Sequence, residues 1–186
     1  MRRSIPDLNE LREYNQKVLH ELSLTEFKEQ VIEQATDFTP KRIVFLPVDG
    51  SVYTEKVVDW ALNNVLKTSD LVILFNVFAS PYNATGGPKT TAKYQDTVEH
   101  VHTEFRQKAV DLIVKLGNVL NSNGIRVKGV VASGSPKKLI DEQIENEHPD
   151  VVIIGRRGLG QIQQMFMGSI SNHLIHSTKV PIILVP

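Results

Sequence analysis

Five short and almost purely apolar runs recur between Lys41 and Pro186, and they restrict the fold more than any other feature. They lack the polar alternation of strands with one solvated face, and segments of helical periodicity lie between them. Parallel strands need crossovers of this kind. The pattern predicts an α/β domain over about residues 41–186, in which helices cover both faces of a parallel sheet. The strand candidates are Ile43–Val48, Leu71–Phe78, Ile125–Val131, Val151–Ile154 and Val180–Val185.

The first forty residues show a different pattern. Apolar residues from Leu8 to Leu22 fall at helical spacing. Ser23 and Glu26 then have the spacing of a capping box, and Phe27, Val31 and Ile32 follow on one helical face. The sequence therefore predicts an N-terminal helical extension over residues 1–40, appended to a single domain over 41–186.

Composition excludes several classes of partner. Lys and Arg number 21, as do Asp and Glu, so the chain lacks the single-sign field that binds nucleic acid or anionic lipid. No apolar run approaches the roughly 18 residues of a membrane span. The chain has no cysteine, and hence no disulfide or thiolate metal site. We expect a cytoplasmic protein that binds neither nucleic acid nor membrane.

A glycine-rich stretch follows the fourth apolar run and has the pattern G-x2-G-x9-G-S. Gly155 and Gly158 come directly after the strand candidate, and Gly168-Ser169 opens the next helical segment. Glycine lets bare backbone approach a ligand closely. The N-terminus of a helix presents unpaired N–H groups and a positive dipole end, both of which favour phosphate. Taken singly, each glycine is more simply a turn residue, but the combination indicates a phosphate site.

Other nucleotide motifs are absent. A P-loop needs a lysine after its second glycine, but Gln161 follows Gly160. The dinucleotide fingerprint G-x-G-x-x-G is missing, as are the H-x-G-H and S-G-G-x-D-S signatures of related adenine-binding enzymes. Arg156 and Arg157 are able to pair with phosphate, but arginines in exposed loops are more often solvated, so neither enters the predicted site.

The glycine spacing resembles the universal stress protein family, specifically its ATP-binding subgroup. The resemblance covers about residues 41–186 and leaves the first forty residues without a counterpart. Four further segments carry it, at the first, second and third strand ends and in the closing strand. They are Leu46–Ser51, Phe75–Val77, Gly134–Pro136 and Val180–Val185.

The resemblance implies a Rossmann-like open sheet of five parallel strands in the order 3-2-1-4-5. That order places the ends of the first and fourth strands at the topological switch point, where such sheets bind ligands. It also implies ATP or AMP as cofactor, with any Mg²⁺ arriving on ATP. The implied binding residues are Asp49 and Val77 beside adenine and ribose, Gly155 and Gly158 along ribose and phosphate, and Gly168, Ser169, Ile170 and Ser171 around phosphate.

Two of these positions have a simpler interpretation. Asp49 is also placed to cap the helix that begins near Ser51, and sequence alone does not separate this from ligand binding. Val77 is an ordinary apolar strand residue, and its role rests on the resemblance alone. His173 and His176 lie three residues apart on one helix, but no carboxylate is evident beside them, so metal ligands stay unknown.

The expected function is binding of an adenine nucleotide by a stress-response sensor or regulator. No arrangement of nucleophile, base and orienting group is visible, so no catalytic residue is named and efficient catalysis is not expected. Family members form homodimers through the closing strand, and Val180–Val185 is apolar here, so a homodimer is expected. A nucleotide-independent dimeric scaffold and a weak ATP hydrolase remain the alternatives.

Overall fold

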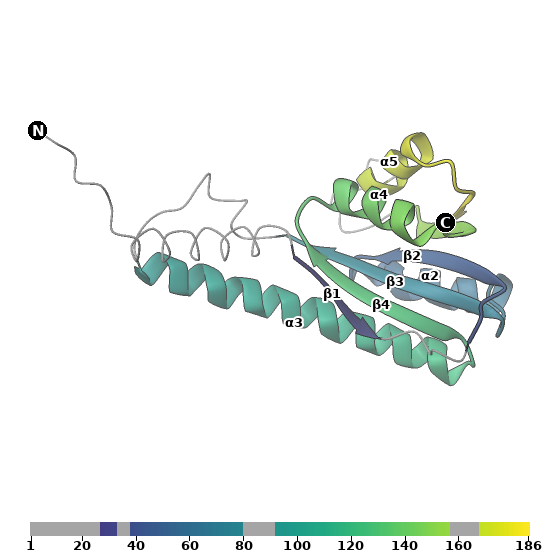
Figure 1. The fold of residues 1–186 in the computed structure, drawn as a ribbon, viewed down its shortest axis with the longest axis horizontal. Helices are drawn as coiled ribbons and strands as arrows, with labels where there is room; N and C mark the ends of the chain where they lie inside the picture. Colours follow the sequence, from purple (N-terminus) through teal and green to yellow (C-terminus); the bar gives the residue numbers. More distant parts are fainter. Residues whose placement is uncertain (1–26, 33–37, 80–91, 157–167) are drawn as a thin grey trace, which may run out of the picture.

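The computed structural model describes residues 27–32, 38–79, 92–156 and 168–186. One sheet lies between two layers of helices (Figure 1). The strands are β1 (Phe27–Ile32), β2 (Arg42–Val48), β3 (Asp70–Phe78), β4 (Arg126–Ser133), β5 (Val151–Gly155) and β6 (Ile182–Val185). The helices are α2 (Val52–Asn64), α3 (Ala92–Ser122), α4 (Pro136–Glu147) and α5 (Ser169–Ser177).

The sheet has six strands in the order β1-β4-β3-β2-β5-β6. Strands β2 to β6 pair in parallel, whereas β1 pairs with β4 in the antiparallel direction. The predicted α/β class and Rossmann-like architecture are confirmed. The prediction of five strands, all parallel, is wrong, because the sheet is mixed and its order differs from the predicted one by the additional edge strand.

The additional strand overturns part of the predicted N-terminal helical extension. Residues 27–32, expected on a helix, form β1. Glu29 forms an ion pair with Arg106 of α3, with an Nε–Oε2 distance of 2.9 Å. Ile32 packs where Gly117 of α3 and Gly129 of β4 have no side chain. The residues that make these contacts are far apart in the sequence, so a local capping pattern cannot predict the contacts. Residues 1–26 lie outside the described residues.

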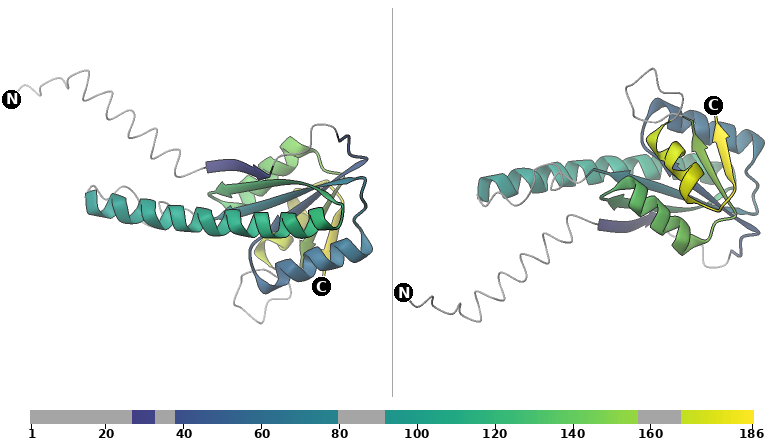
Figure 2. Two further views of the ribbon diagram at one scale, coloured as in Figure 1. Left: turned by 90° about the horizontal axis from the view of Figure 1, so that it is seen from below. Right: turned by 90° about the horizontal axis from the view of Figure 1, so that it is seen from above.

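The two faces of the sheet carry separate apolar layers. In β2, Val44, Leu46 and Val48 join the layer beneath α2 and α3, whereas Phe45 joins the layer beneath α4 and α5. Figure 2 shows the two pairs of helices on opposite sides of the strands. Alternate residues of one strand therefore serve opposite layers, which explains why the strands are apolar without polar alternation.

Local signals set several element ends as expected. Pro136 occupies the first turn of α4. Gly124, with φ of 76°, follows the end of α3, a left-handed conformation that glycine adopts without strain. The closing strand is shorter than predicted, because β6 begins at Ile182 and Pro181 precedes it. The expected loop at Ser80–Thr91 lies outside the described residues.

Helix α3 is the longest element, with 31 residues. At about 1.5 Å per residue it spans roughly 46 Å, whereas the 9 residues of β3 span roughly 30 Å. Its first turns consequently project beyond the sheet (Figures 1 and 2). Within the described ranges, no helix combines the length and apolar character needed to cross a bilayer.

Candidate functional site

The candidate site lies where β2 and β5 are neighbours at the centre of the sheet. The chain leaves β2 toward β3 on one side and β5 toward β6 on the other, which makes this the topological switch point. Val48 pairs with Asn76 of β3. The register of β2 with β5, continued to the strand ends, sets Val48 opposite Gly155. The predicted segments at Asp49, Val77 and Gly155 therefore end at the same edge.

Asp49 orders the turn that leads from β2 into α2. Its Oδ1 accepts hydrogen bonds from the Ser51 backbone N–H at 3.0 Å and from the Thr54 hydroxyl at 2.9 Å. Ser51 is the N-cap of α2, and its hydroxyl accepts from the Tyr53 N–H. Asp49 therefore stabilises the start of α2, which is the simpler of its two predicted roles. The carboxylate remains half-buried, and its contact with adenine or ribose stays a prediction.

Val77 lies at the end of β3 and is the one residue of that strand that is not fully buried. It packs at the margin of the apolar layer beneath α4 and α5, as Ile170 of α5 does. Val77 and the first turn of α5 consequently lie on the same face of the sheet. A half-buried apolar surface at this margin suits the flat face of a base.

The backbone of Arg156 connects β5 to the beginning of α5. Its N–H donates to the Val185 carbonyl, and its carbonyl accepts from the Gly168 N–H, both at 2.7 Å. The Ser171 hydroxyl is buried and lies 3.3 Å from the Arg156 carbonyl and 3.1 Å from that of Gly168. The structure therefore brings Gly155, Gly168 and Ser171 together. The side chain of Ser171 faces the protein, so only its N–H remains for a ligand.

Helix α5 begins with backbone donors that no side chain of the described residues caps. Gly168, with φ of −68°, is the N-cap and has no side chain to accept from them. The first intrahelical bond is that of the Asn172 N–H to the Gly168 carbonyl, at 2.9 Å. The N–H groups of Ser169, Ile170 and Ser171 precede it and have no partner within the helix. Three converging amides at a positive helix end fit a phosphate.

Other predicted positions give a mixed picture. Gly158 lies outside the described residues. His173 contacts a carboxylate that the sequence did not place beside it, because its Nε2 lies 2.7 Å from Oδ2 of Asp141 on α4. Ser177 donates to the other oxygen of this carboxylate, at 3.0 Å. In the part of the chain that the structure describes, no group of three or more His, Asp or Glu residues is arranged to hold a metal ion.

Sequence reasoning missed two features of this edge. Asn76 is buried and its Nδ2 donates to the Val48 carbonyl at 2.7 Å, which joins the ends of β2 and β3. The sequence signal for this contact was the single polar residue, Asn76, within the apolar run Leu71–Phe78. The second feature is a pocket of about 60 Å³ beside the first turns of α2. Its lining residues are Tyr53, Val57, Gly155, Arg156, Val185 and Pro186.

The family model, the curated relatives and the solved structures all indicate the same family. Residues 41–186 match the model of the Universal stress protein family. A universal stress protein A family protein of Schizosaccharomyces pombe is 27% identical over 181 residues, which cover 92% of this chain and 53% of that protein. This chain thus spans about half the length of that relative.

Solved structures share the fold at low sequence identity. The universal stress protein UspA from Lactobacillus plantarum matches with a TM-score of 0.67 and 14% identity, over 80% of this chain and 99% of that one. An Arabidopsis thaliana family member with AMP bound matches with a TM-score of 0.56 and 16% identity, over 77% and 90%. A universal stress protein in complex with cAMP matches with a TM-score of 0.52 and 15% identity, over 79% and 98%.

Proposed function

Because this chain belongs to the universal stress protein family, we propose that it binds an adenine nucleotide at the carboxyl edge of β2 and β5. The N-terminus of α5 at the switch point, which no described side chain caps, is the observation that carries the proposal. The AMP and cAMP complexes of proteins with the same fold support this class of ligand.

In this proposal each part of the nucleotide meets a different element. The base and ribose contact Asp49 and the half-buried margin at Val77. The ribose and phosphates pass Gly155 and Gly158. The phosphates accept hydrogen bonds from the first turn of α5, through the Ser169 hydroxyl and the N–H groups of Ser169, Ile170 and Ser171. Gly168 contributes by leaving space, since a Cβ there would stand beside the incoming phosphate.

The nucleotide is ATP or AMP, and Mg²⁺ accompanies ATP. Occupancy of the site changes the affinity of the protein for its regulatory partners in a cytoplasmic stress response. Asp49 Oδ1 is already engaged at the start of α2. Binding is therefore favoured over hydrolysis, although a slow hydrolase stays an alternative.

The same proposal includes a homodimer formed through β6. This edge strand is apolar, and the outer side of Ile182–Val185 pairs with no other strand among the described residues. An apolar edge of this kind favours pairing with a second copy.

A direct test is to denature freshly purified protein and identify released small molecules by mass spectrometry, then titrate AMP and ATP by calorimetry. Gly168→Val is expected to weaken binding roughly tenfold or more, since the added side chain blocks phosphate contacts. Asn172→Val, at an exposed position one turn further along α5, is the matched control and should bind normally. Absence of nucleotide in the native protein, together with no binding of added AMP or ATP, would favour the nucleotide-independent scaffold.

A further inference from the structure

Helix α5 is short and depends on its surroundings for its position. It has 9 residues, which span roughly 14 Å, and helices of this length are marginal on their own in water. Leu174 is fully buried in the apolar layer beneath α4 and α5. Apolar burial is non-directional, so it holds the helix against the sheet without fixing its rotation. Directional contacts are needed to fix the rotation.

Asp141 of the neighbouring helix α4 makes contacts of this kind. Its Oδ2 lies 2.7 Å from Nε2 of His173, and its Oδ1 accepts from the Ser177 hydroxyl at 3.0 Å. A carboxylate accepts hydrogen bonds and does not donate them, so the His173 Nε2 is the donor. His173 and Ser177 are four residues apart and therefore lie one above the other on one face of α5. We call these three residues the α4–α5 clamp.

The clamp connects one carboxylate to two successive turns of α5. A single contact leaves a helix free to turn about it, whereas two contacts one turn apart restrict both rotation and sliding along the helix axis. The side chains of His173 and Asp141 are 25% and 35% exposed. Partly exposed pairs contribute little to the stability of a fold. The main consequence of the clamp is therefore the orientation of α5.

This orientation bears on the turn that carries the proposed phosphate contacts. His173 lies in the turn that follows residues 169–171, whose N–H groups point toward the start of the helix axis. A rotation of α5 therefore moves all three amides together. At the start of the helix, the Gly168 N–H donates to the Arg156 carbonyl at 2.7 Å. The first turn is thus held in front by a backbone contact and behind by the clamp.

We infer that Asp141 is a positioning residue for nucleotide binding, which acts through His173 and Ser177 to aim the first amides of α5 at the phosphate. The inference rests on the proposed function and gives a role to side chains that lie beyond the proposed phosphate contacts. Because coupling between two sites is reciprocal, a bound phosphate also tightens the clamp. The clamp thereby connects occupancy of the nucleotide site to α4.

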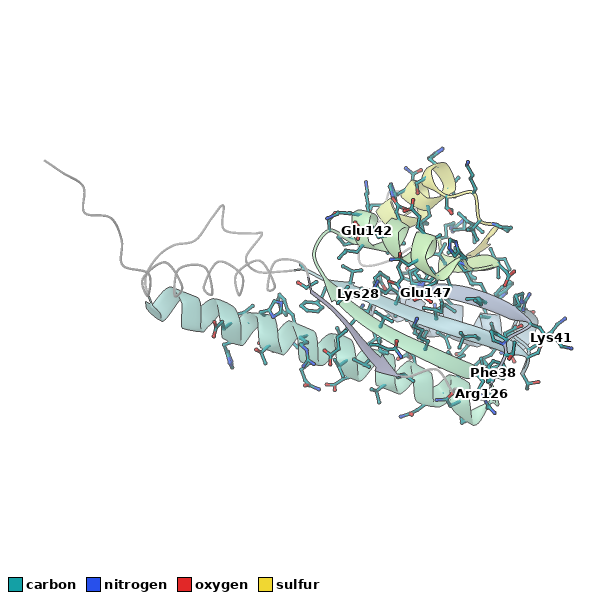
Figure 3. All side chains as sticks on the ribbon, in the orientation of Figure 1. Lys28, Phe38, Lys41, Arg126, Glu142 and Glu147 are labelled. Carbon is teal, nitrogen blue, oxygen red and sulfur yellow. The ribbon has the colours of Figure 1, made fainter. Side chains whose placement is uncertain are left out.

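The test is isothermal titration of the full chain with AMP and, separately, with ATP, for the native protein and for Asp141→Asn. Asparagine offers one carbonyl oxygen in place of two acceptors, so nucleotide binding should weaken roughly three- to tenfold. The sign of the change is informative, because loss of a negative charge alone would strengthen the attraction of phosphate. Glu142→Gln is the matched control. It removes the same charge from the next residue of α4, which is exposed (Figure 3), and should not weaken binding.

A second pair of variants separates positioning from a general loss of packing. His173→Gln keeps an N–H donor for Asp141 and should retain most of the native affinity, whereas His173→Leu removes the donor and should weaken binding like Asp141→Asn. Hydrogen exchange of residues 168–177, followed by mass spectrometry without nucleotide, reports the clamp directly. Exchange should be faster in Asp141→Asn and His173→Leu than in the native chain and in Glu142→Gln.

The outcomes separate this inference from the proposed function. If the native chain binds nucleotide and Asp141→Asn binds it equally or more tightly, the positioning role is overturned and the proposed function stands. Equal exchange of α5 in the native chain and in Asp141→Asn also overturns the positioning role. Failure of the native chain to bind AMP or ATP overturns the proposed function and this inference with it. If Asp141→Asn does not fold by circular dichroism, the two His173 variants decide in the same way.

Discussion

The two outer strands of the sheet differ in nearly every respect. At one edge, β1 is antiparallel to β4, has a register irregularity between Gln30 and Ile32, and exposes Lys28 and Gln30. At the other edge, β6 is parallel to β5, regular, and entirely apolar. Irregularities and charged side chains discourage pairing with another chain, whereas a regular apolar strand invites it. As far as the described residues show, the sheet is therefore protected at the β1 edge and available at the β6 edge.

The edges also differ in what holds them. β1 is attached to α3 as well as to β4, through the Glu29–Arg106 ion pair and the packing of Ile32 beside Gly117 and Gly129. In β6, Val185 is buried, and Ile182, Ile183 and Leu184 stay half-buried. The family model begins at residue 41, so the protected edge is built by a segment that precedes the matched region.

The largest expected effect comes from breaking the attachment of β1. Ile32→Asp places a carboxylate between α3 and β4, where its solvation is lost, and should lower the free energy of unfolding by about 2–4 kcal/mol. Urea unfolding measures the change. Gln30→Asp, with the same new charge at an exposed position of the same strand, should change stability by less than about 0.5 kcal/mol. Equal effects of both variants would mean that Ile32 does not anchor the strand.

The next effect concerns the available edge. If two copies pair through β6, Ile183→Lys brings like charges together in the dimer and should raise its dissociation constant roughly tenfold or more. Sedimentation equilibrium reports this constant directly. Gln30→Lys adds the same charge to the opposite edge and should leave the dimer intact. A chain that is monomeric before substitution would contradict pairing through β6. A dimer that is sensitive to Gln30→Lys instead would place the interface at the β1 edge.

The smallest expected effect concerns α3, the helix to which β1 is attached, and depends on pH. His102 of α3 packs against Phe78, and burial, with a further contribution from the charge of Arg106, lowers its pKa below the usual 6.5. As pH falls below about 6.5, the unfolded chain takes up a proton that the folded chain binds less well, so stability declines. His102→Gln should show a shallower decline in urea midpoints between pH 7.5 and 5.5. Parallel pH profiles for the two chains would exclude this contribution.

The sequence predicted the parts of the fold that depend on local patterns. The five apolar runs became β2 to β6, and Pro136 and Gly124 mark helix ends as expected. It failed at β1, where Ser23 and Glu26 resemble a capping box. The decisive contacts of residues 27–32 are with β4 and α3, about a hundred residues away, and no local periodicity encodes them.

For the site, motif spacing located the edge but not the direction of individual side chains. Gly155 and Gly168 lie close together because the Arg156 carbonyl accepts from the Gly168 N–H. Ser171 was expected to contact the ligand, yet its hydroxyl faces carbonyl oxygens of the protein. Arg156 was expected to be solvated, yet its Nε is buried. Side-chain burial depends on packing between β5, α2 and the chain end, which no short motif records.

The pairing of β1 with β4 also sets an order of events during synthesis. Phe27 pairs with Ser133, so the strand is made about a hundred residues before its partner exists. At roughly 5–20 residues per second, this leaves β1 unpaired for roughly 5–20 s while β2, β3 and α3 emerge. The protected edge of the sheet is therefore closed by the strand that is synthesised before the other five and is paired only after β4 has followed.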